Sequence, residues 1–231
     1  MSPRFSRRTV LTMAVGGLAA AAAPPVRHAF AQLDDRPWFF LTDDEARWLA
    51  AVADVFIPED EYPSASQAGV VDYIDFQMAT DYGRGAGLYL QGPFLEGVPE
   101  QGYQLPFTPS ELIRLGIEGA RAEADLAGMD AAQQEGWVTD LSGRSDSLGD
   151  VPAGTFFTEL LSLTNEGYFA DPIYLGNRNY AGWEMVGFPG AHAYYLELVD
   201  EHNRPYLRQP MGIAHDRSGR STLPRPVAQG G

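Results

Sequence analysis

The sequence predicts an all-α domain of about six helices, with a long ordered loop rich in aromatic residues and glycine and an extended C-terminal tail. Apolar residues recur at helical spacing in six segments, and three of these begin with a capping residue followed three positions later by Glu or Gln. No segment shows the sustained alternation of apolar and polar residues that strands require. With 231 residues, of which 45% are hydrophobic, the chain is long enough for one packed domain.

The first two helices are predicted near the start of this domain. Thr42 and Glu45 form a capping box, and apolar residues at helical spacing follow as far as Pro58, which ends the helix. A second helix is predicted over 66–80 or 69–80. Residues 81–107 then carry six Gly and three Pro, which predicts mostly loop. The bulky apolar side chains of this loop indicate that it is ordered by packing against another surface.

Two further capping motifs place the middle helices. Thr108, followed by Pro and by Glu at the third helical position, opens a helix that is expected to run to about Ala127. Asp130, with Gln three residues later, opens the next helix, which is expected to end at Gly143.

The last predicted elements follow a polar turn at 144–153. Apolar residues from Phe156 onward predict a helix that closes at Gly167. The aromatic, glycine-rich run 166–190 does not have a helical pattern, and a final helix is expected to begin near Pro189. Beyond residue 203 no periodicity is visible.

The first 31 residues have the features of an export signal. Arginines precede a weakly apolar stretch over 10–23, and a small-x-small motif ends at Ala31. The apolar stretch is too short to span a bilayer, which needs roughly 20 residues. The run 6–11, SRRTVL, resembles a twin-arginine (Tat) signal through Arg7 and Arg8. The alternative is an ordinary Sec signal. The resemblance implies export of an already folded protein by the Tat translocase, and a periplasmic location.

Charge and composition exclude several classes of function. The net charge of −15 argues against nucleic acid as a partner. The absence of cysteine and lysine excludes disulfides, thiol nucleophiles, Cys-bound zinc, covalent haem attachment and Schiff-base catalysis. The predicted domain, 32–202, has a net charge of −23, whereas the tail, 203–231, has +4. The tail is either disordered or lies along an acidic surface of this chain or of a partner.

The run 166–190, EGYFADPIYLGNRNYAGWEMVGFPG, resembles the gluconate 2-dehydrogenase subunit 3 family. More general similarities extend over roughly residues 40–195. The resemblance implies a non-catalytic small subunit of a flavin-dependent dehydrogenase of sugars or sugar acids. It implies partners, namely an FAD-containing large subunit and a c-type cytochrome subunit, and a role in maturation and Tat export of the flavoprotein.

No cofactor site is expected in this chain. The nearest approach to a G-x-G-x-x-G motif is the run 83–87, which has the wrong spacing and follows no strand. FAD and haem c are therefore expected in the partner subunits. No catalytic residue is assigned, because no nucleophile or third group is evident beside Asp171 and His192. No metal-binding residue is assigned, because the segment between His192 and His202 is expected to be a helix end with solvated acids.

The residues proposed to contact a partner all lie in the run 166–190: Tyr168, Phe169, Asp171, Tyr174, Asn177, Arg178, Trp183 and Phe188. Each has another interpretation. The aromatic residues are core or interface, and Arg178 binds a carboxylate or carbonyl of this chain or of a partner. Asp171 either caps a turn before Pro172 or forms an acid–base pair with His192 in a free-standing enzyme. A third possibility is a sugar-binding module that stacks its ligand on the aromatic residues.

Overall fold

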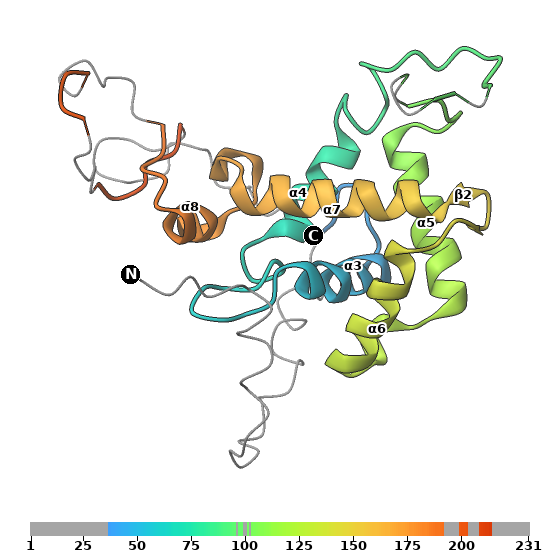
Figure 1. The fold of residues 1–231 in the computed structure, drawn as a ribbon, viewed down its shortest axis with the longest axis horizontal. Helices are drawn as coiled ribbons and strands as arrows, with labels where there is room; N and C mark the ends of the chain where they lie inside the picture. The colour runs from blue at the N-terminus through green and yellow to red at the C-terminus, as the bar shows by residue number, and fades with distance from the viewer. Residues whose placement is uncertain are drawn as a thin grey trace, which may run out of the picture.

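The computed structural model describes residues 37–95, 97–98, 101, 103–191, 199–202 and 208–213. Within these ranges the chain forms six α-helices and one small antiparallel hairpin, so the all-α prediction is confirmed (Figure 1). The proposed signal, 1–31, lies outside the described residues. The helices are α3 (Asp43–Phe56), α4 (Val70–Ala79), α5 (Pro109–Glu123), α6 (Ala131–Ser142), α7 (Ala153–Phe169) and α8 (Ala181–Val186).

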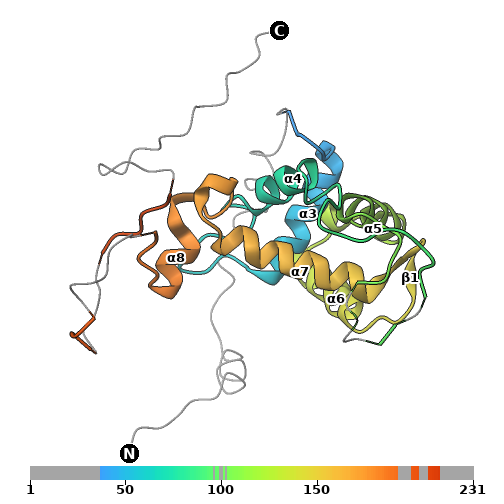
Figure 2. The same cartoon turned by 90° about the horizontal axis from the view of Figure 1, so that it is seen from above.

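Helix α7 is the central element of the domain. It contacts the five other α-helices, and its length carries it from the hairpin to α8 (Figures 1 and 2). The hairpin joins β1 (Ser147–Leu148) to β2 (Val151–Pro152). The polar-turn prediction for 144–153 missed this hairpin. Its buried residues, Leu148 and Val151, lie beside the turn and pack into the core.

The core is centred on Trp48 of α3. Its indole stacks on Phe156 of α7 with ring centroids 6.1 Å apart, and meets Trp137 of α6 edge-on at 5.7 Å. Burying large aromatic side chains from three helices removes a large apolar area from water. The helix faces predicted from apolar spacing therefore meet in one core.

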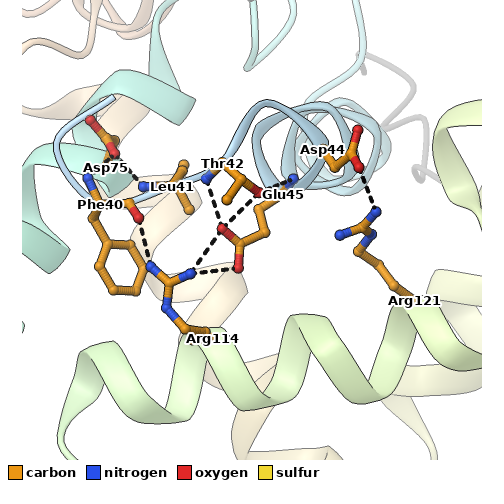
Figure 3. Close-up of polar contacts among 8 residues, drawn as sticks. All are labelled: Phe40, Leu41, Thr42, Asp44, Glu45, Asp75, Arg114 and Arg121. Carbon is orange, nitrogen blue, oxygen red and sulfur yellow. Dashed lines mark hydrogen bonds and ion pairs between the residues drawn. The ribbon is translucent and has the colours of Figure 1, made fainter. Parts of the chain in front are cut away.

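A polar cluster fixes the chain where it enters α3 (Figure 3). Both oxygens of Glu45 accept hydrogen bonds from Arg114 of α5, at 2.9 and 3.1 Å, while Glu45 also completes the predicted capping box with Thr42. Arg114 donates to the Phe40 carbonyl at 2.6 Å, and its guanidinium lies 4.0 Å from the centre of the Phe40 ring. One arginine thus ties α5 to the start of α3.

Helix α5 is shorter than expected. It ends at Glu123 instead of about Ala127, and a 3-10 turn, η2 (Leu126–Gly128), follows. Ala124 and Leu126 are both buried. The backbone is extended at Ala124, with φ −151° and ψ 129°, so the helix ends before these two buried residues.

Helix α7 is longer than expected, because Gly167 does not end it. A Cβ atom at Gly167 would lie 3.0 Å from the Tyr73 ring, so this glycine serves close packing of α7 against α4. The helix ends two residues later, at Phe169.

The helix expected from Pro189 does not begin there. Gly190 has a φ of +88° and pairs in an isolated parallel bridge with Met211. The remainder of that prediction, 192–198, lies outside the described residues. Among the described residues, the sixth helix is instead α8, within the run that was expected to be loop.

Candidate functional site

The candidate site is the motif segment, which we define as residues 166–190. It begins in the last turn of α7 and contains two 3-10 turns, η3 (Pro172–Tyr174) and η4 (Arg178–Tyr180), before α8. The prediction that this run is non-helical was therefore wrong for α8 and for the end of α7. Its order was predicted correctly, and hydrogen bonds within the chain account for it.

Asn177 holds the middle of the motif segment together. Its side chain is fully buried, donates to the Ala170 carbonyl at 2.8 Å and accepts from the Gly182 amide at 2.9 Å. The backbone amide of Asn177 donates to the Gly167 carbonyl at 2.9 Å. Asn177 therefore joins the end of α7 to the start of α8. The amide side chain suits this position, because it supplies a donor and an acceptor together.

Arg178 connects the motif segment to helix α4. Its guanidinium donates to Asp72 at 2.7 Å, and its backbone amide donates to the Ala68 carbonyl at 2.9 Å. Of the two partners considered for Arg178, the structure shows the one within this chain. A Cβ atom at Gly69 would lie 2.8 Å from the Arg178 Nε atom, so the arginine also packs closely against the backbone.

Asp171 is a cap, as one of its two interpretations predicted. Its Oδ1 atom accepts from the Ile173 amide at 3.0 Å, and its Oδ2 atom accepts from the Ile213 amide at 2.7 Å. The Tyr180 hydroxyl accepts from the Gly212 amide at 3.0 Å. Gly212 and Ile213 of the basic tail are thus hydrogen-bonded to the motif segment. His192, the proposed acid–base partner of Asp171, lies outside the described residues.

The five aromatic residues proposed as interface contacts are divided between the interior and the surface. Tyr168 is fully buried and its hydroxyl donates to the Pro63 carbonyl at 2.7 Å, while Trp183 is buried and its indole donates to the Phe169 carbonyl at 2.7 Å. Phe169 is partly buried. In contrast, Tyr174 and Phe188 keep nearly half of their surface exposed. Only the last two offer a large apolar surface to a partner.

The backbone of the motif segment is strained. All the non-glycine residues with positive φ among those described lie here: Leu175, Asn177, Asn179 and Tyr180. Such conformations cost free energy for residues with a Cβ atom and persist only where surrounding contacts impose them. The hydrogen bonds of Asn177 and the ion pair of Arg178 supply those contacts. No signal in the sequence reveals this strain, apart from the two asparagines, which tolerate positive φ.

A shallow hollow lies beside the start of the motif segment, with a volume of about 340 Å³. Tyr73 and Glu166 form part of its wall, and the Tyr73 hydroxyl donates to Glu166 at 2.9 Å. Burial, followed by the Glu166 carboxylate, raises the pKa of Tyr73 well above its ordinary value. Its phenol therefore stays protonated. The remaining lining residues are Gln77, Phe169, Ala170, Asp171 and Tyr174.

Most of the chain matches a known protein family. Residues 43–190 match the family described as gluconate 2-dehydrogenase subunit 3. The chain belongs to this family. The match begins at the first residue of α3 and ends at the last residue of the motif segment, so it spans the whole helical body. Members of the family are subunits of a dehydrogenase complex, which implies partner subunits. No curated protein and no solved structure gives a significant match.

The described residues lack two further features. None of their helices has both the length and the apolar character needed to cross a membrane. None of their His, Asp and Glu side chains gather in threes or more so as to hold a metal ion.

The residues that form hydrogen bonds with the motif segment from elsewhere in the chain were not predicted from the sequence. Asp72 and Tyr73 lie on α4, about a hundred positions away, and Pro63 precedes that helix. Asp72 falls among apolar residues of an amphipathic helix and has the pattern of a solvated side chain. Its pairing with Arg178 depends on how α4 lies against α7, which local spacing does not reveal.

Proposed function

We propose that this protein is the non-catalytic small subunit of a periplasmic, FAD-dependent dehydrogenase of gluconate or a related sugar. In this proposal a large subunit holds FAD and oxidises the substrate, and a c-type cytochrome subunit accepts the electrons. This chain binds no cofactor itself. It is needed for maturation of the flavoprotein and for its export by the Tat pathway.

The observation that carries the proposal is that the helical body belongs to this family while the polar side chains of its motif segment are hydrogen-bonded within the chain. Asp171, Asn177 and Arg178 are the polar residues of the motif segment most suited to chemistry. Each is engaged with backbone groups or a carboxylate of this chain. Side chains engaged in this way maintain a folded surface, which favours a structural role over a catalytic one.

Export through the Tat translocase is supported by the paired Arg7 and Arg8 of the predicted signal. The Tat pathway transports folded proteins, and a flavoprotein must hold its FAD before it crosses the membrane. A small helical subunit with a signal sequence, bound to the flavoprotein, would take both across. We propose cleavage after Ala31, so that the exported protein begins at Gln32 and has a net charge of −19.

Replacing Arg7 and Arg8 by Lys tests this role. The change keeps the positive charge of the signal but removes the paired arginines. We expect this chain and the proposed FAD subunit, co-expressed with it, to remain in the cytoplasm, as measured by fractionation and dehydrogenase activity. As a control, Arg4→Lys should leave export unchanged. Normal export of the flavoprotein in the Arg7→Lys/Arg8→Lys variant would refute the carrier role.

A second candidate function is direct binding of a sugar in the hollow beside Tyr73. Its lining combines the rings of Tyr174 and Phe169 with the polar groups of Gln77 and Glu166. Aromatic faces and hydrogen-bonding groups together suit a small polyol. Calorimetry of the purified subunit with gluconate, glucose and fructose tests this function. Heat no greater than that of dilution would eliminate it.

A further inference from the structure

Three consecutive backbone amides of the basic tail donate hydrogen bonds to the motif segment. The amides of residues 211–213 donate, in order, to the Pro189 carbonyl at 3.3 Å, the Tyr180 hydroxyl at 3.0 Å and the Asp171 carboxylate at 2.7 Å. In return, the Ala191 amide donates to the carbonyl of the first of these tail residues at 2.7 Å. We call the four residues that pair with the tail the pairing edge: Asp171, Tyr180, Pro189 and Ala191.

The tail is held at the pairing edge by its main chain and only slightly by its side chains. Ile213 is 68% exposed although its amide is hydrogen-bonded, and Met211 is only partly buried. Gly212 is buried and has no side chain to bury. An extended segment that pairs in this way with the edge of another segment is a common mode of peptide recognition, in which main-chain hydrogen bonds supply the affinity.

Gly190 leaves the space that the tail occupies. A Cβ atom at Gly190 would lie 2.3 Å from the Met211 carbonyl oxygen and 2.6 Å from the Met211 amide nitrogen. A side chain at position 190 would therefore force the two segments apart. Gly187 also has a positive φ, of +68°, but nothing lies within 4 Å of a Cβ atom built there. Of these two glycines, only Gly190 is required by the contact with the tail.

The tail also lines a hollow beside α8, with a volume of about 410 Å³. Trp183, Glu184 and Phe188 of the motif segment line it together with Arg208 and Pro210 of the tail. The hollow therefore includes one acidic and one basic side chain. The whole tail has a net charge of +4, whereas the predicted domain has −23. Opposite net charges attract the tail towards the domain and favour the paired state.

We propose that the pairing edge is a binding site for an extended peptide, and that the tail of this chain is its resident ligand. The site recognises consecutive main-chain amides with a glycine at their centre. In the wild-type chain the tail fills the site, so a second peptide binds only after it displaces the tail. This inference goes beyond the proposed function, because it concerns this chain alone and needs no partner subunit.

Proline at position 213 tests the ligand side of this site in the full chain. Ile213→Pro removes the amide that donates to Asp171, whereas Ile213→Ala keeps that amide and removes only an exposed side chain. We expect the amides of 211 and 212 to exchange with solvent about tenfold or more faster in the proline variant, and within about threefold of wild type in the alanine variant. Equal effects of the two variants would overturn recognition through the main chain.

Two glycine variants test the receiving side in the same way. Gly190→Ala places a Cβ atom against the Met211 backbone, whereas Gly187→Ala introduces a comparable positive-φ strain with no contact. We expect exchange of the 211–213 amides to become about tenfold or more faster in the Gly190 variant only. Unchanged exchange in this variant, or the same increase in both, would refute the role of Gly190 at the pairing edge.

Binding in trans tests whether the pairing edge is a peptide site. The probe is a synthetic peptide of residues 208–213, RQPMGI, acetylated and amidated at its ends. It is titrated into the full-length Ile213→Pro chain while the Ala191 amide is followed by NMR. A tethered segment has an effective concentration in the mM range, so the free peptide should bind with a Kd of about 1 mM or below.

Wild type should bind this peptide about tenfold or more weakly than the Ile213→Pro chain, because its own tail competes. A control peptide with proline in place of Ile213 should bind neither chain. The inference would be overturned if the Ile213→Pro chain bound no peptide at about 5 mM, or if wild type bound it equally well. Wild-type dimers that Ile213→Pro converts to monomers would place the tail on a second copy and refute the assignment. Each measurement uses this chain alone, so failure of a dehydrogenase complex to form would affect only the proposed function.

Discussion

The guanidinium of Arg178 lies 2.7 Å from the carboxylate of Asp72, a residue 106 positions earlier in the chain. This ion pair joins the first turn of α4 to the strained turn before α8. The Arg178 side chain also lies across the backbone of Gly69, where α4 begins. The pair therefore links the part of the chain that resembles its family most specifically to the body of the helical domain.

Replacing Arg178 by Gln is expected to lower the free energy of unfolding by about 1–2 kcal/mol, as measured by urea denaturation. The value is limited because the Arg178 side chain is 39% exposed, although that of Asp72 is only 15% exposed. Arg84→Gln is the matched control, since the Arg84 and Asp81 side chains are 64% and 81% exposed. Its cost should stay below about 0.5 kcal/mol. Equal costs would mean that the partial burial of Asp72 does not make its ion pair with Arg178 more stabilising than an exposed pair.

Replacing Gly69 by Ala is expected to cost about 2 kcal/mol or more. The φ of +87° is unfavourable for alanine, and the new Cβ atom would lie 2.8 Å from Arg178 Nε and 2.9 Å from the Leu175 carbonyl oxygen. Gly149→Ala separates the two causes. Gly149 has a φ of +60° but nothing within 4 Å of the added atom, so its cost should be about 1 kcal/mol. A smaller loss at Gly69 than at Gly149, by urea denaturation, would contradict this account.

Replacing Asp75 by Asn is expected to cost about 2–3 kcal/mol. The Asp75 carboxylate is buried and accepts hydrogen bonds from the amides of Phe39, Phe40 and Leu41, at 2.9, 2.8 and 2.8 Å. An Asn side chain offers one acceptor and turns an NH2 group towards a remaining backbone donor.

Hydrogen exchange checks this prediction locally, because the amides of 39–41 should exchange faster in the Asp75→Asn variant. Asp130→Asn is the control. Asp130 is a helix cap, at which Asn performs about as well as Asp, so its unfolding free energy should hardly change. A loss in the Asp75 variant no larger than in this control would refute the prediction.

Asp54 is expected to make the protein less stable as the pH rises from about 4. Burial raises the pKa of Asp54, although hydrogen bonds from Ser66 oppose this shift. The folded state then binds more protons than the unfolded state above the ordinary pKa, so the contribution of Asp54 to stability is complete below that value. It is lost as the pH rises through the raised pKa of the folded state.

Asp54→Asn removes this titration. The stability of wild type relative to the variant should be highest near pH 4 and should fall towards pH 7, as measured by urea midpoints across that range. Because the other acids are present in both proteins, the difference isolates Asp54. A difference that grew with pH would reverse the sign and contradict the raised pKa.

Replacing Asp171 by Asn is expected to leave the turnover of the assembled dehydrogenase within about twofold of wild type. We assign Asp171 a capping role, because its two oxygens accept from the amides of Ile173 and Ile213. Loss of one acceptor should lower the unfolding free energy by about 1 kcal/mol. A fall in kcat of a hundredfold or more, with the complex intact, would instead favour the acid–base role.

The starts of three helices could be predicted from the sequence because each depends on residues three positions apart. Thr42, Thr108 and Asp130 all accept from the amide three residues later, and each is paired with a reciprocating Glu or Gln side chain. The apolar spacing after these caps also identified the core faces. Local chemistry was sufficient for these features, since no distant residue takes part in a capping box.

Helix ends and loop structure were predicted less well, because tertiary contacts decide them. Gly167 has the identity of a terminating residue, yet α7 continues through it since the glycine is needed against Tyr73. The hairpin at 147–152 is too short to show a strand pattern, and packing of Leu148 and Val151 holds it in place. In both cases tertiary packing, and not the local sequence preference, determined the backbone conformation.

The sequence by itself determined the all-α class, the capped helix starts and the family resemblance, all of which rest on patterns of residues close together in the chain. Only the tertiary structure decided that Arg178 binds Asp72, that Asn177 bridges two helices, and that Tyr89 and Leu95 remain exposed. Such pairings depend on the relative positions of helices that are far apart in the chain, and helical spacing specifies which face of a helix is buried but not what that face meets.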